Sequence, residues 1–443
     1  MKKIALCLAL LGLLGLGGQA LAVICTIDEV PAATLLLPYF EVDFDNPNGA
    51  NTLFSINNAS ATAVLAHVVV WSDLSKVVLD FNVYLTGYDV QTISVSDLLH
   101  GVLPQTASAG QDPGDHISPK GTFSQDINFA SCSGGFLPPP VSLGTDFVNH
   151  LRNATTGRPD PLFHGPNGLP GCFGRNLGDN IGRGYITVDT VNSCTLANPG
   201  TSGYFSTITT AQNVLWGDYF YVNNAANFAD GNPLVHIEAS LTDPATTTPG
   251  NYTFYGRYDT VPFTAEDHRE PLSTNFATRF LNGGTFSGGT DLIVWRDSHS
   301  TGAQETQFNC GDAGLAAANP WYPLGEEGIV IFDEQEQPNL LPTFPISPQP
   351  ESSTPSPFPA ETQSVHVGGD DLPVPYAFGW MYLNLNTTIP SEPAPADIAA
   401  DQAWVVTRMT SQGRFSVGFD AIQLDSACAA LHFCPGGCSP STP

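Results

Sequence analysis

Residues 78–87 read VLDFNVYLTG, and this regular alternation of side chains constrains the fold of the chain more than any other feature. Successive residues of a β-strand point to opposite faces, so alternation over eight residues predicts a strand with one buried face. The predicted buried set is Leu79, Phe81, Val83 and Leu85, and the opposite set is Asp80, Asn82, Tyr84 and Thr86.

Other segments also favour strands. Residues 38–44, PYFEVDF, alternate in the same way, and Pro38 at the start predicts an edge or the beginning of a strand. Residues 65–71 are almost continuously apolar, which is typical of a central strand covered on both faces. The 43 glycines and 37 prolines interrupt long helices and mark turns. The sequence therefore predicts an all-β protein of antiparallel, immunoglobulin-like sandwiches.

An apolar run that ends in Trp-x-Asp occurs twice, as VVVWSD at 68–73 and as LIVWRD at 292–297. Four other features recur in the same order. They are Thr52-x-Phe54 with Thr278-x-Phe280, 77–81 with 329–333, 184–192 with 379–387, and the strands around Trp216 and Trp404. Each similarity is weak by itself, because strands rich in Val, Ile and Trp resemble one another. The shared order predicts two related modules in tandem, with Trp71 and Trp295 at equivalent positions.

The expected organisation follows from this repeat. A signal peptide spans 1–22, a first module spans 23–250, a second spans 251–427, and a cysteine-rich tail spans 428–443. Irregular inserts are expected at about 96–183 in the first module and at about 338–375, rich in proline, in the second. Surface insertions of different length are tolerated because closing a longer loop costs little additional entropy. If the repeat were false, 338–375 would instead be an interdomain linker.

The N-terminus has the pattern of an export signal. Lys2 and Lys3 precede an apolar run at 4–16, and Ala20-Leu21-Ala22 provides a cleavage site. Cys25 raises a lipoprotein alternative, but Ile24 departs from the small residue that lipoprotein processing prefers. Cleavage after residue 22 leaves 421 of the 443 residues, and no later run is long and apolar enough to span a bilayer. We expect a secreted, periplasmic or cell-surface protein.

The charge balance limits the partners of the chain. It has 42 acidic and 14 basic residues, with a formal net charge of −28. Such a chain repels nucleic acid and anionic membranes. It attracts cations, although a net negative charge also keeps an exported protein soluble. A cell-surface or extracellular glycan or protein is the expected kind of partner.

The cysteine count is even once Cys7 leaves with the signal peptide. An even count in an exported chain predicts disulfides, although the spacing does not fix their pairing. His432 lies within the tail cluster, so zinc is an alternative for the last three cysteines. The eight cysteines are Cys25, Cys132, Cys172, Cys194, Cys310, Cys428, Cys434 and Cys438.

The stretch 43–51, DFDNPNGAN, is the best calcium candidate. Asp43, Asp45, Asn46 and Asn48 offer oxygen ligands in a tight turn, although the spacing departs from an EF-hand. Shorter acidic turns occur at 325–328 and 368–371. The same residue types are common in ordinary strand connections, so a structural calcium ion is one of two interpretations.

The two Trp-x-Asp motifs also have two interpretations. An exposed Trp beside a carboxylate could stack on a sugar ring, whereas a buried Trp would fill the core of a sandwich, with the Asp beginning a turn. The sequence favours the core. His67 and His236 lie in predicted strands and are expected to be structural.

Catalytic signatures are scarce. H-E-x-x-H, a P-loop and an opening G-x-G-x-x-G are absent, and Ser287 lacks the G-x-S-x-G spacing. Asp267, His268 and Arg269 form a polar cluster near the module junction, but adjacent residues rarely converge on one substrate. The leading hypothesis is an exported, non-catalytic protein with a structural, adhesive or binding role. The alternative is a secreted protein that binds or hydrolyses carbohydrate.

Overall fold

The computed structural model describes residues 29–105, 130–132, 136–137, 139–140, 142–165, 167–249, 253–258, 266–297, 308–310, 322–339, 356–388 and 402–424, together with Ile24. The protein is mostly β, and every strand pair among the described residues is antiparallel. The predicted signal peptide lies outside these residues. No helix within the described ranges is long and apolar enough to cross a membrane.

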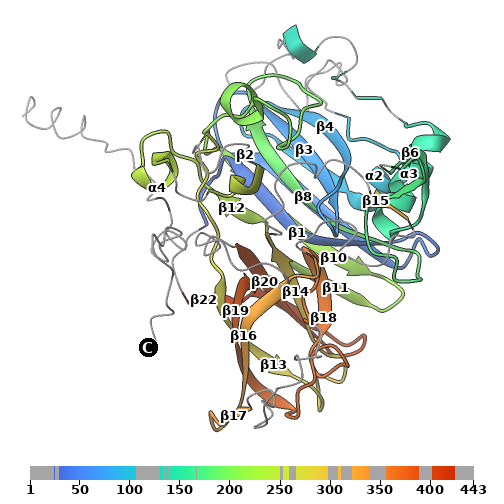
Figure 1. Ribbon diagram of the computed structural model, residues 1–443, viewed down its shortest axis with the longest axis vertical. Coiled ribbons are helices and arrows are strands. Elements are labelled where there is room, and N and C mark those ends of the chain that lie inside the picture. The colour runs from blue at the N-terminus through green and yellow to red at the C-terminus, as the bar shows by residue number, and fades with distance from the viewer. Residues whose placement is uncertain are drawn as a thin grey trace, which may run out of the picture.

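Two sheets are built from the first half of the chain, in the upper part of Figure 1. Sheet I has the order β12 (Val235–Ile237), β1 (Thr34–Asp43), β8 (Ile181–Val191), β3 (Val64–Ser72), β4 (Val77–Leu85). Sheet II has the order β11 (Phe228–Pro233), β10 (Asp218–Asn223), β2 (Ala50–Asn58), β5 (Val90–Ser94), and β9 (Leu215–Trp216) also pairs with β2.

Two further sheets come from the second half, in the lower part of Figure 1. Sheet III has the order β17 (Pro338–Asn339), β16 (Gly325–Asp333), β19 (Phe378–Thr388), β13 (Asn275–Leu281), β22 (Ile422–Gln423). Sheet IV has the order β18 (Thr362–His366), β14 (Gly289–Arg296), β20 (Ala403–Thr410), β21 (Ser416–Asp420).

A small sheet V joins the two halves. Its order is β15 (Phe308–Asn309), β7 (Pro170–Cys172), β6 (Asp160–His164). The helices are short: α2 (Val95–Leu99), α3 (Thr145–Thr156), α4 (Pro244–Thr247), the 3-10 turns η2 (Ala130–Cys132) and η4 (Gly256–Tyr258), and the π turn η3 (Tyr204–Ile208). The predicted insert at 96–183 therefore contains regular structure, including α3, which ends at Gly157 with φ 66°. The proline-rich insert likewise begins with β17 and contains β18.

Each pair of sheets shares a buried cluster. Phe40 of β1 and Ile56 of β2 belong to one cluster, and Phe280 of β13 and Leu292 of β14 belong to another. All nine residues of β3 are buried, which confirms the predicted central strand. Burial of large apolar surface in both clusters is the main stabilising contribution.

Strand β4 is buried more completely than its alternation predicts. Leu79, Phe81 and Val83 are buried as expected, but Asn82 and Tyr84 are buried as well. Tyr84 packs in a cluster with Cys132 and Cys194, so the segments that carry this disulfide cover the second face. The expectation of a half-exposed strand was wrong because alternation within one strand does not reveal a covering insert.

Pro38 does not begin a strand. It lies inside β1, where the register with β8 shifts between Leu37 and Phe40. Proline is tolerated at such a bulge because it has no N–H to donate to a neighbouring strand. Its carbonyl oxygen accepts a hydrogen bond from the Thr362 hydroxyl of β18, so the bulge also contacts the second half.

The two halves have the same strand order. Nine strands of the first half each have a counterpart at the same place in the sheets of the second half. In chain order, β1, β2, β3, β4, β5, β8, β10, β11 and β12 of sheets I and II correspond to β13, β14, β16, β17, β18, β19, β20, β21 and β22 of sheets III and IV. This correspondence shows that the predicted equivalence of Trp71 and Trp295 was wrong. Trp71 lies on β3, whose counterpart is β16, whereas Trp295 lies on β14, the counterpart of β2.

Only two of the five recurring features lie on corresponding strands. They are 184–192 with 379–387, on β8 and β19, and the strands around Trp216 and Trp404. Trp216 lies on β9, which pairs with β2 in the same register as β10, and Trp404 lies on β20, which pairs with β14. The other three lie on strands that do not correspond. Short apolar patterns resemble one another by composition alone, so the predicted alignment of the two halves was displaced by one strand.

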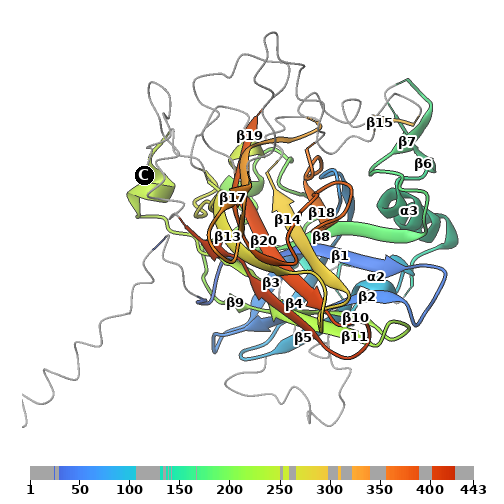
Figure 2. The same ribbon diagram turned by 90° about the horizontal axis from the view of Figure 1, so that it is seen from below.

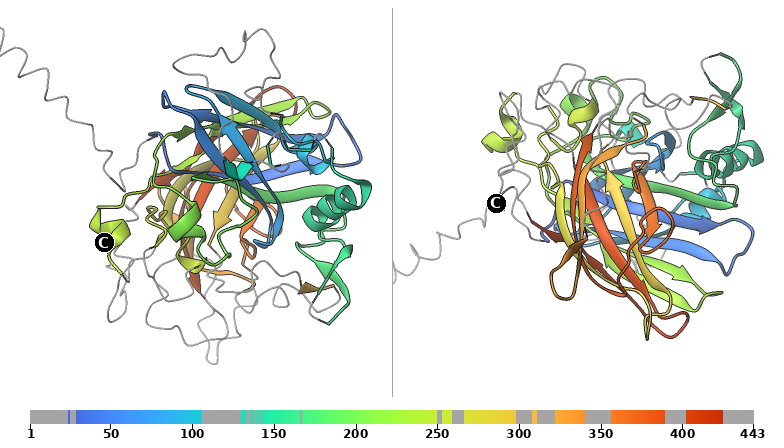
Figure 3. Two further views of the ribbon diagram at one scale, coloured as in Figure 1. Left: turned by 90° about the horizontal axis from the view of Figure 1, so that it is seen from above. Right: turned by 60° about the horizontal axis from the view of Figure 1, so that its bottom comes forward.

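Sheet I packs against sheet IV. Strands β14 and β18 contact β1, β18 also contacts β8, and edge strand β21 lies beside edge strand β11. Seen from below in Figure 2, β13, β14 and β20 lie in front of β3 and β4, and Figure 3 shows the same stacking from above. The interior between sheets I and IV therefore combines residues from both halves.

Two disulfides are present among the described cysteines. Cys132 pairs with Cys194, and Cys172 of β7 pairs with Cys310 beside β15, which connects the two halves covalently. The predicted bonding is confirmed for these four residues. The other four cysteines of the predicted mature chain, and the alternative zinc site in the tail, lie outside the described residues.

Candidate functional site

The two tryptophans of the repeated motif meet in one core. Trp71 is 0% exposed and Trp295 is 1% exposed, so the predicted burial is confirmed and the sugar-platform interpretation is wrong for both. Tyr185 lies between them: its ring stacks on Trp71 at 5.7 Å and meets Trp295 edge-on at 6.0 Å. The Trp71 indole N–H donates to the Thr187 hydroxyl at 3.0 Å. This core fills the space between sheets I and IV.

The motif aspartates bind arginines. Asp73 accepts hydrogen bonds from Nε of Arg175 at 2.6 Å and from its backbone N–H at 3.0 Å. Asp297 accepts one from Arg257 at 3.1 Å. Both carboxylates are almost completely buried. They contribute to buried ion pairs as well as ending their strands.

A first buried cluster surrounds Arg257, whose guanidinium also pairs with Glu361 and donates to Tyr185 at 2.8 Å. Tyr322 donates to the other Glu361 oxygen at 3.2 Å. Lys76 lies nearby, and burial lowers its pKa to about 8, partly offset by the Glu361 carboxylate. These groups come from η4, β8, the β3–β4 turn and the segments before β16 and β18, so they connect the halves.

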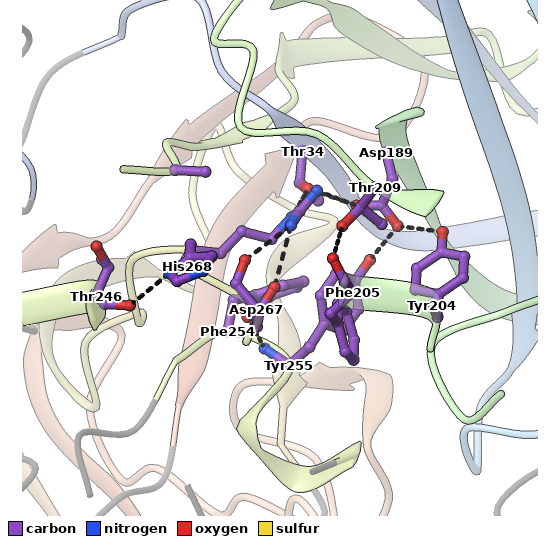
Figure 4. A network of polar contacts seen from close by, with 12 residues as sticks. Thr34, Asp189, Tyr204, Phe205, Thr209, Thr246, Phe254, Tyr255, Asp267 and His268 are labelled. Atoms are coloured by element: carbon purple, nitrogen blue, oxygen red, sulfur yellow. Dashed lines mark hydrogen bonds and ion pairs between the residues drawn. The ribbon is translucent and has the colours of Figure 1, made fainter. Parts of the chain in front are cut away.

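A second buried cluster surrounds Arg269 and is shown in Figure 4. Its guanidinium contacts Asp267 at 3.1 Å and Asp189 at 3.4 Å. The Asp189 carboxylate also accepts hydrogen bonds from Tyr204 at 2.8 Å and from Tyr255 at 3.0 Å. Burial raises the pKa of Asp267 to about 6, with Arg269 opposing the shift.

The three residues of the predicted polar cluster at 267–269 therefore do not share one environment. Asp267 and Arg269 are buried in this network, while His268, with φ 58°, contacts the Thr246 carbonyl at 3.2 Å. These three side chains do not converge on a common substrate site. Their contacts hold the connecting segment against sheet I.

The two predicted structural histidines are inside the fold. His67 is buried, its Nδ1 lies 3.2 Å from the Asn82 oxygen, and burial lowers its pKa to about 4. His236 accepts a hydrogen bond from the Gly217 N–H at 3.4 Å, and burial lowers its pKa. These contacts are those expected of structural histidines, and the structural role of both side chains stays a prediction.

The calcium candidates form a turn between β1 and β2. Asp43 accepts hydrogen bonds from the backbone N–H groups of Asp45 and Asn46 at 2.9 and 3.1 Å, and Asn46 accepts one from Asn48 at 3.0 Å. Asp45 forms an exposed ion pair with Arg152 at 3.1 Å. These contacts are those of a capped turn. Calcium binding here stays a prediction.

The other acidic turns do not join this site. Gly325 and Glu326 lie in β16, whereas Asp370 and Asp371 lie in the turn after β18. Ser287 lies in the turn between β13 and β14. In the part of the chain that the structure describes, no group of three or more His, Cys, Asp or Glu residues could hold a metal ion.

The best candidate for ligand binding is a cleft of about 370 Å³ where the β10–β11 and β20–β21 turns meet. Arg408 lies at its base, with its guanidinium over the rings of Tyr221 at 5.5 Å and Phe228 at 5.4 Å. Asp291 contacts the guanidinium at 3.4 Å, and Glu41 adds a second carboxylate to the lining.

The rest of the cleft lining is polar with an aromatic rim. Asn51, Asn223, Asn227 and Gln412 supply amide groups, and Phe415 is 47% exposed. Amides and carboxylates can hydrogen-bond hydroxyl groups while aromatic faces pack on apolar sugar surfaces. The two carboxylates leave the cleft with no excess positive charge, so its chemistry fits a small neutral polar ligand better than an anion.

Sequence reasoning missed Arg175, Arg257 and Arg408. A usable signal was present, because basic residues are rare in this chain and Arg257 lies in the aromatic segment YTFYGRYD. A cation in such surroundings is usually buried and paired, since an unpaired buried charge is too costly.

Comparison with known proteins assigns the chain to no family. No family model, no curated protein and no solved structure matches the chain. The fold and the site therefore define the protein only as a disulfide-bonded, β-rich chain in which buried ion pairs join two halves.

Proposed function

We propose that this chain is an exported, non-catalytic protein with a structural, adhesive or extracellular binding role, built from two related immunoglobulin-like β-sandwich modules. The observation that carries the proposal is that several of the few basic side chains of this protein are engaged in buried ion pairs. Arg175, Arg257 and Arg269 are held in ion pairs between or beside sheets I and IV. Side chains committed to such contacts join modules into one rigid unit.

Support for related modules comes from matching contacts on corresponding strands. The Thr52 hydroxyl bonds the backbone N–H and C=O of Glu41 at 3.0 and 3.2 Å. The Thr290 hydroxyl does the same with Leu281 at 2.9 Å for each. Position 41 follows Phe40 in β1, and position 281 follows Phe280 in β13.

A second matching contact involves glycine. A Cβ added at Gly184 would lie 2.8 Å from the Phe40 ring, and one added at Gly379 would lie 3.0 Å from the Phe280 ring. In both halves the glycine makes room for the aromatic ring across the strand pair. Two independent contacts in the same register favour duplication over coincidence.

Export and role can be tested together. Expression in an exporting host should yield a mature protein that begins at Val23, read by intact-mass and N-terminal analysis. An activity screen with polysaccharide, ester and peptide substrates should show no turnover. Turnover that disappears when Glu41 and Asp291 are replaced by Gln and Asn would overturn the non-catalytic role.

Carbohydrate binding is the second candidate, because the cleft combines amides, carboxylates and Phe415. A glycan array would test it, with Asn223→Ala and Phe415→Ala as cleft variants. Leu241→Ala is the matched control, since Leu241 is 65% exposed and lies outside the cleft lining. Selective loss in the cleft variants supports this candidate, and absence of any glycan signal for the wild type removes it.

A further inference from the structure

Arg408 keeps part of its hydrogen-bonding capacity open toward the cleft. Its guanidinium lies over the rings of Tyr221 and Phe228, which support its position. Nη2 makes two long contacts, to the carboxylate of Asp291 and to the hydroxyl of Ser364, both at 3.4 Å. Nε and Nη1 have no hydrogen-bond acceptor among the described residues, and the Arg408 side chain stays 11% exposed in the cleft lining. These N–H groups can therefore donate to a ligand.

Glu41 brings the opposite charge to the same cleft. Its Oε1 accepts a hydrogen bond from the Tyr39 hydroxyl at 2.8 Å, and its Oε2 has no hydrogen-bond donor in the described part of the chain. Glu41 and Arg408 are too far apart to form an ion pair. Burial lowers the pKa of Arg408, but Glu41 and then Asp291 outweigh this effect and raise it. The two unpaired charges therefore act on one another across the cleft.

The arginines of the two buried clusters are used differently. Arg257 and Arg269 are at most 4% exposed, and each contacts two carboxylates directly. Arg408 contacts one carboxylate, that of Asp291, which also lies 2.8 Å from Nδ1 of His366. The ionic contacts of Arg408 are therefore fewer and longer, although basic residues are scarce in this chain.

These two charges select among the classes of small ligand. An anion meets repulsion from Glu41, from Asp291 and from the formal net charge of −28. A cation leaves the open N–H groups of Arg408 without an acceptor, and a neutral sugar gives neither charge an ionic partner. A zwitterion satisfies both charges at once. The cleft volume of about 370 Å³ is near the lower end of the range for ligand sites, so the zwitterion is small.

We propose that the cleft binds a free α-amino acid with an aromatic or other apolar side chain. Its carboxylate accepts hydrogen bonds from Nε and Nη1 of Arg408, and its ammonium group donates to Oε2 of Glu41. The side chain packs against Phe415, which is 47% exposed at the rim. The lining comes from both halves, and Asn227 donates to the Gly413 carbonyl where their turns meet, so the ligand bridges the halves. This inference rests on the extracellular binding role proposed above and names the ligand class.

The test is isothermal titration calorimetry on the mature protein at neutral pH and low salt. The probes are L-phenylalanine, phenethylamine, which lacks the carboxylate, hydrocinnamate, which lacks the ammonium group, and methyl glucoside. L-Phenylalanine should bind, and each analogue with one charge should bind about tenfold more weakly or worse, because a charge-assisted contact is lost. The inference is overturned if L-phenylalanine does not bind at up to about 10 mM. An analogue or a glucoside that binds as tightly as L-phenylalanine also overturns it.

Variants pair each charge of the protein with one charge of the ligand. Glu41→Gln, which keeps an acceptor for Tyr39, should weaken L-phenylalanine by about tenfold or more without weakening hydrocinnamate. Arg408→Gln should weaken L-phenylalanine without weakening phenethylamine.

The matched controls are Glu334→Gln and Arg279→Gln, which are exposed, lie outside the cleft lining and should bind as wild type. Thermal melts show whether each variant is folded, and the analogues test both charges on the unaltered protein. Equal weakening of all probes by Glu41→Gln contradicts the assigned pairing. Export and the activity screen read the proposed function separately, so either can fail without the other.

Discussion

Removing the Arg257 guanidinium should destabilise the protein far more than removing an exposed one. In Arg257→Met, the side chains of Glu361 and Asp297 stay 0% and 1% exposed and lose their shared cation. Removing one partner of a buried ion pair costs about 3–5 kcal/mol, because the remaining charge is uncompensated. If both halves unfold together, an unfolding entropy of about 2.1 cal/mol/K per residue over about 400 residues converts this loss into about 4–6 °C in Tm.

The matched control is Arg183→Met. Its pair with Asp179 has side chains that are 17% and 43% exposed, so its loss should cost about 1 kcal/mol or less. Urea unfolding at neutral pH measures both variants. In the double variant with Glu361→Gln, the two effects should be non-additive by about 0.5–3 kcal/mol. Equal losses in Arg257→Met and Arg183→Met would refute the reasoning.

Three further predictions concern other buried groups. Burial raises the pKa of Asp80 to about 7, so its contribution to stability is present in acid and is lost as the pH rises through that value. Asp80→Asn should therefore be nearly neutral at about pH 4 and stabilise at about pH 8, by at most about 4 kcal/mol, and urea titrations at both pH values will check it. Replacing Cys172 and Cys310 by Ser opens a loop of 138 residues and should cost about 5 kcal/mol, against about 4 kcal/mol for the 62-residue loop of Cys132 and Cys194; a smaller loss for the first pair in chemical denaturation would contradict the loop-entropy argument. Trp71→Ala and Trp295→Ala should each cost about 3–5 kcal/mol in thermal or urea unfolding, and the double variant should cost less than the sum because both rings pack on Tyr185; wild-type stability in either single variant would argue against burial.

Local patterns predicted local structure well. The apolar run at 65–71 gave a completely buried strand, and the placement of Trp71 and Trp295 in a core is confirmed. These outcomes follow from side-chain periodicity, which is a property of one strand and its immediate neighbours. No knowledge of distant segments is needed for such a prediction.

Contacts between distant segments were not predictable in this way. Tyr84 is buried because residues around Cys132 and Cys194 cover it, and Pro38 is tolerated because β1 bulges at that point. The equivalence of Trp71 and Trp295 was wrong because similar strand compositions cannot fix which strands correspond. Hydrogen bonds of Thr52 and Thr290 fix that correspondence, and they are visible only in the folded protein.

The candidate cleft shows the same limit. Arg408, Asp291 and Glu41 come from three strands that are far apart in the sequence. Nothing in the local sequence of any one of them indicates that the three side chains meet. The scarcity of basic residues could have directed attention to Arg408, but not to its partners.

The disulfide pairing has a consequence for the order of events during synthesis. Along the chain the four bonded cysteines appear as Cys132, Cys172, Cys194 and Cys310, and the native bonds interleave. An oxidase that joins cysteines in order of emergence would link Cys132 to Cys172, which is a non-native bond. Correct maturation therefore requires that Cys132 stay unpaired until Cys194 is available and that Cys172 stay unpaired until Cys310 is available, or that an isomerase exchange the early bond.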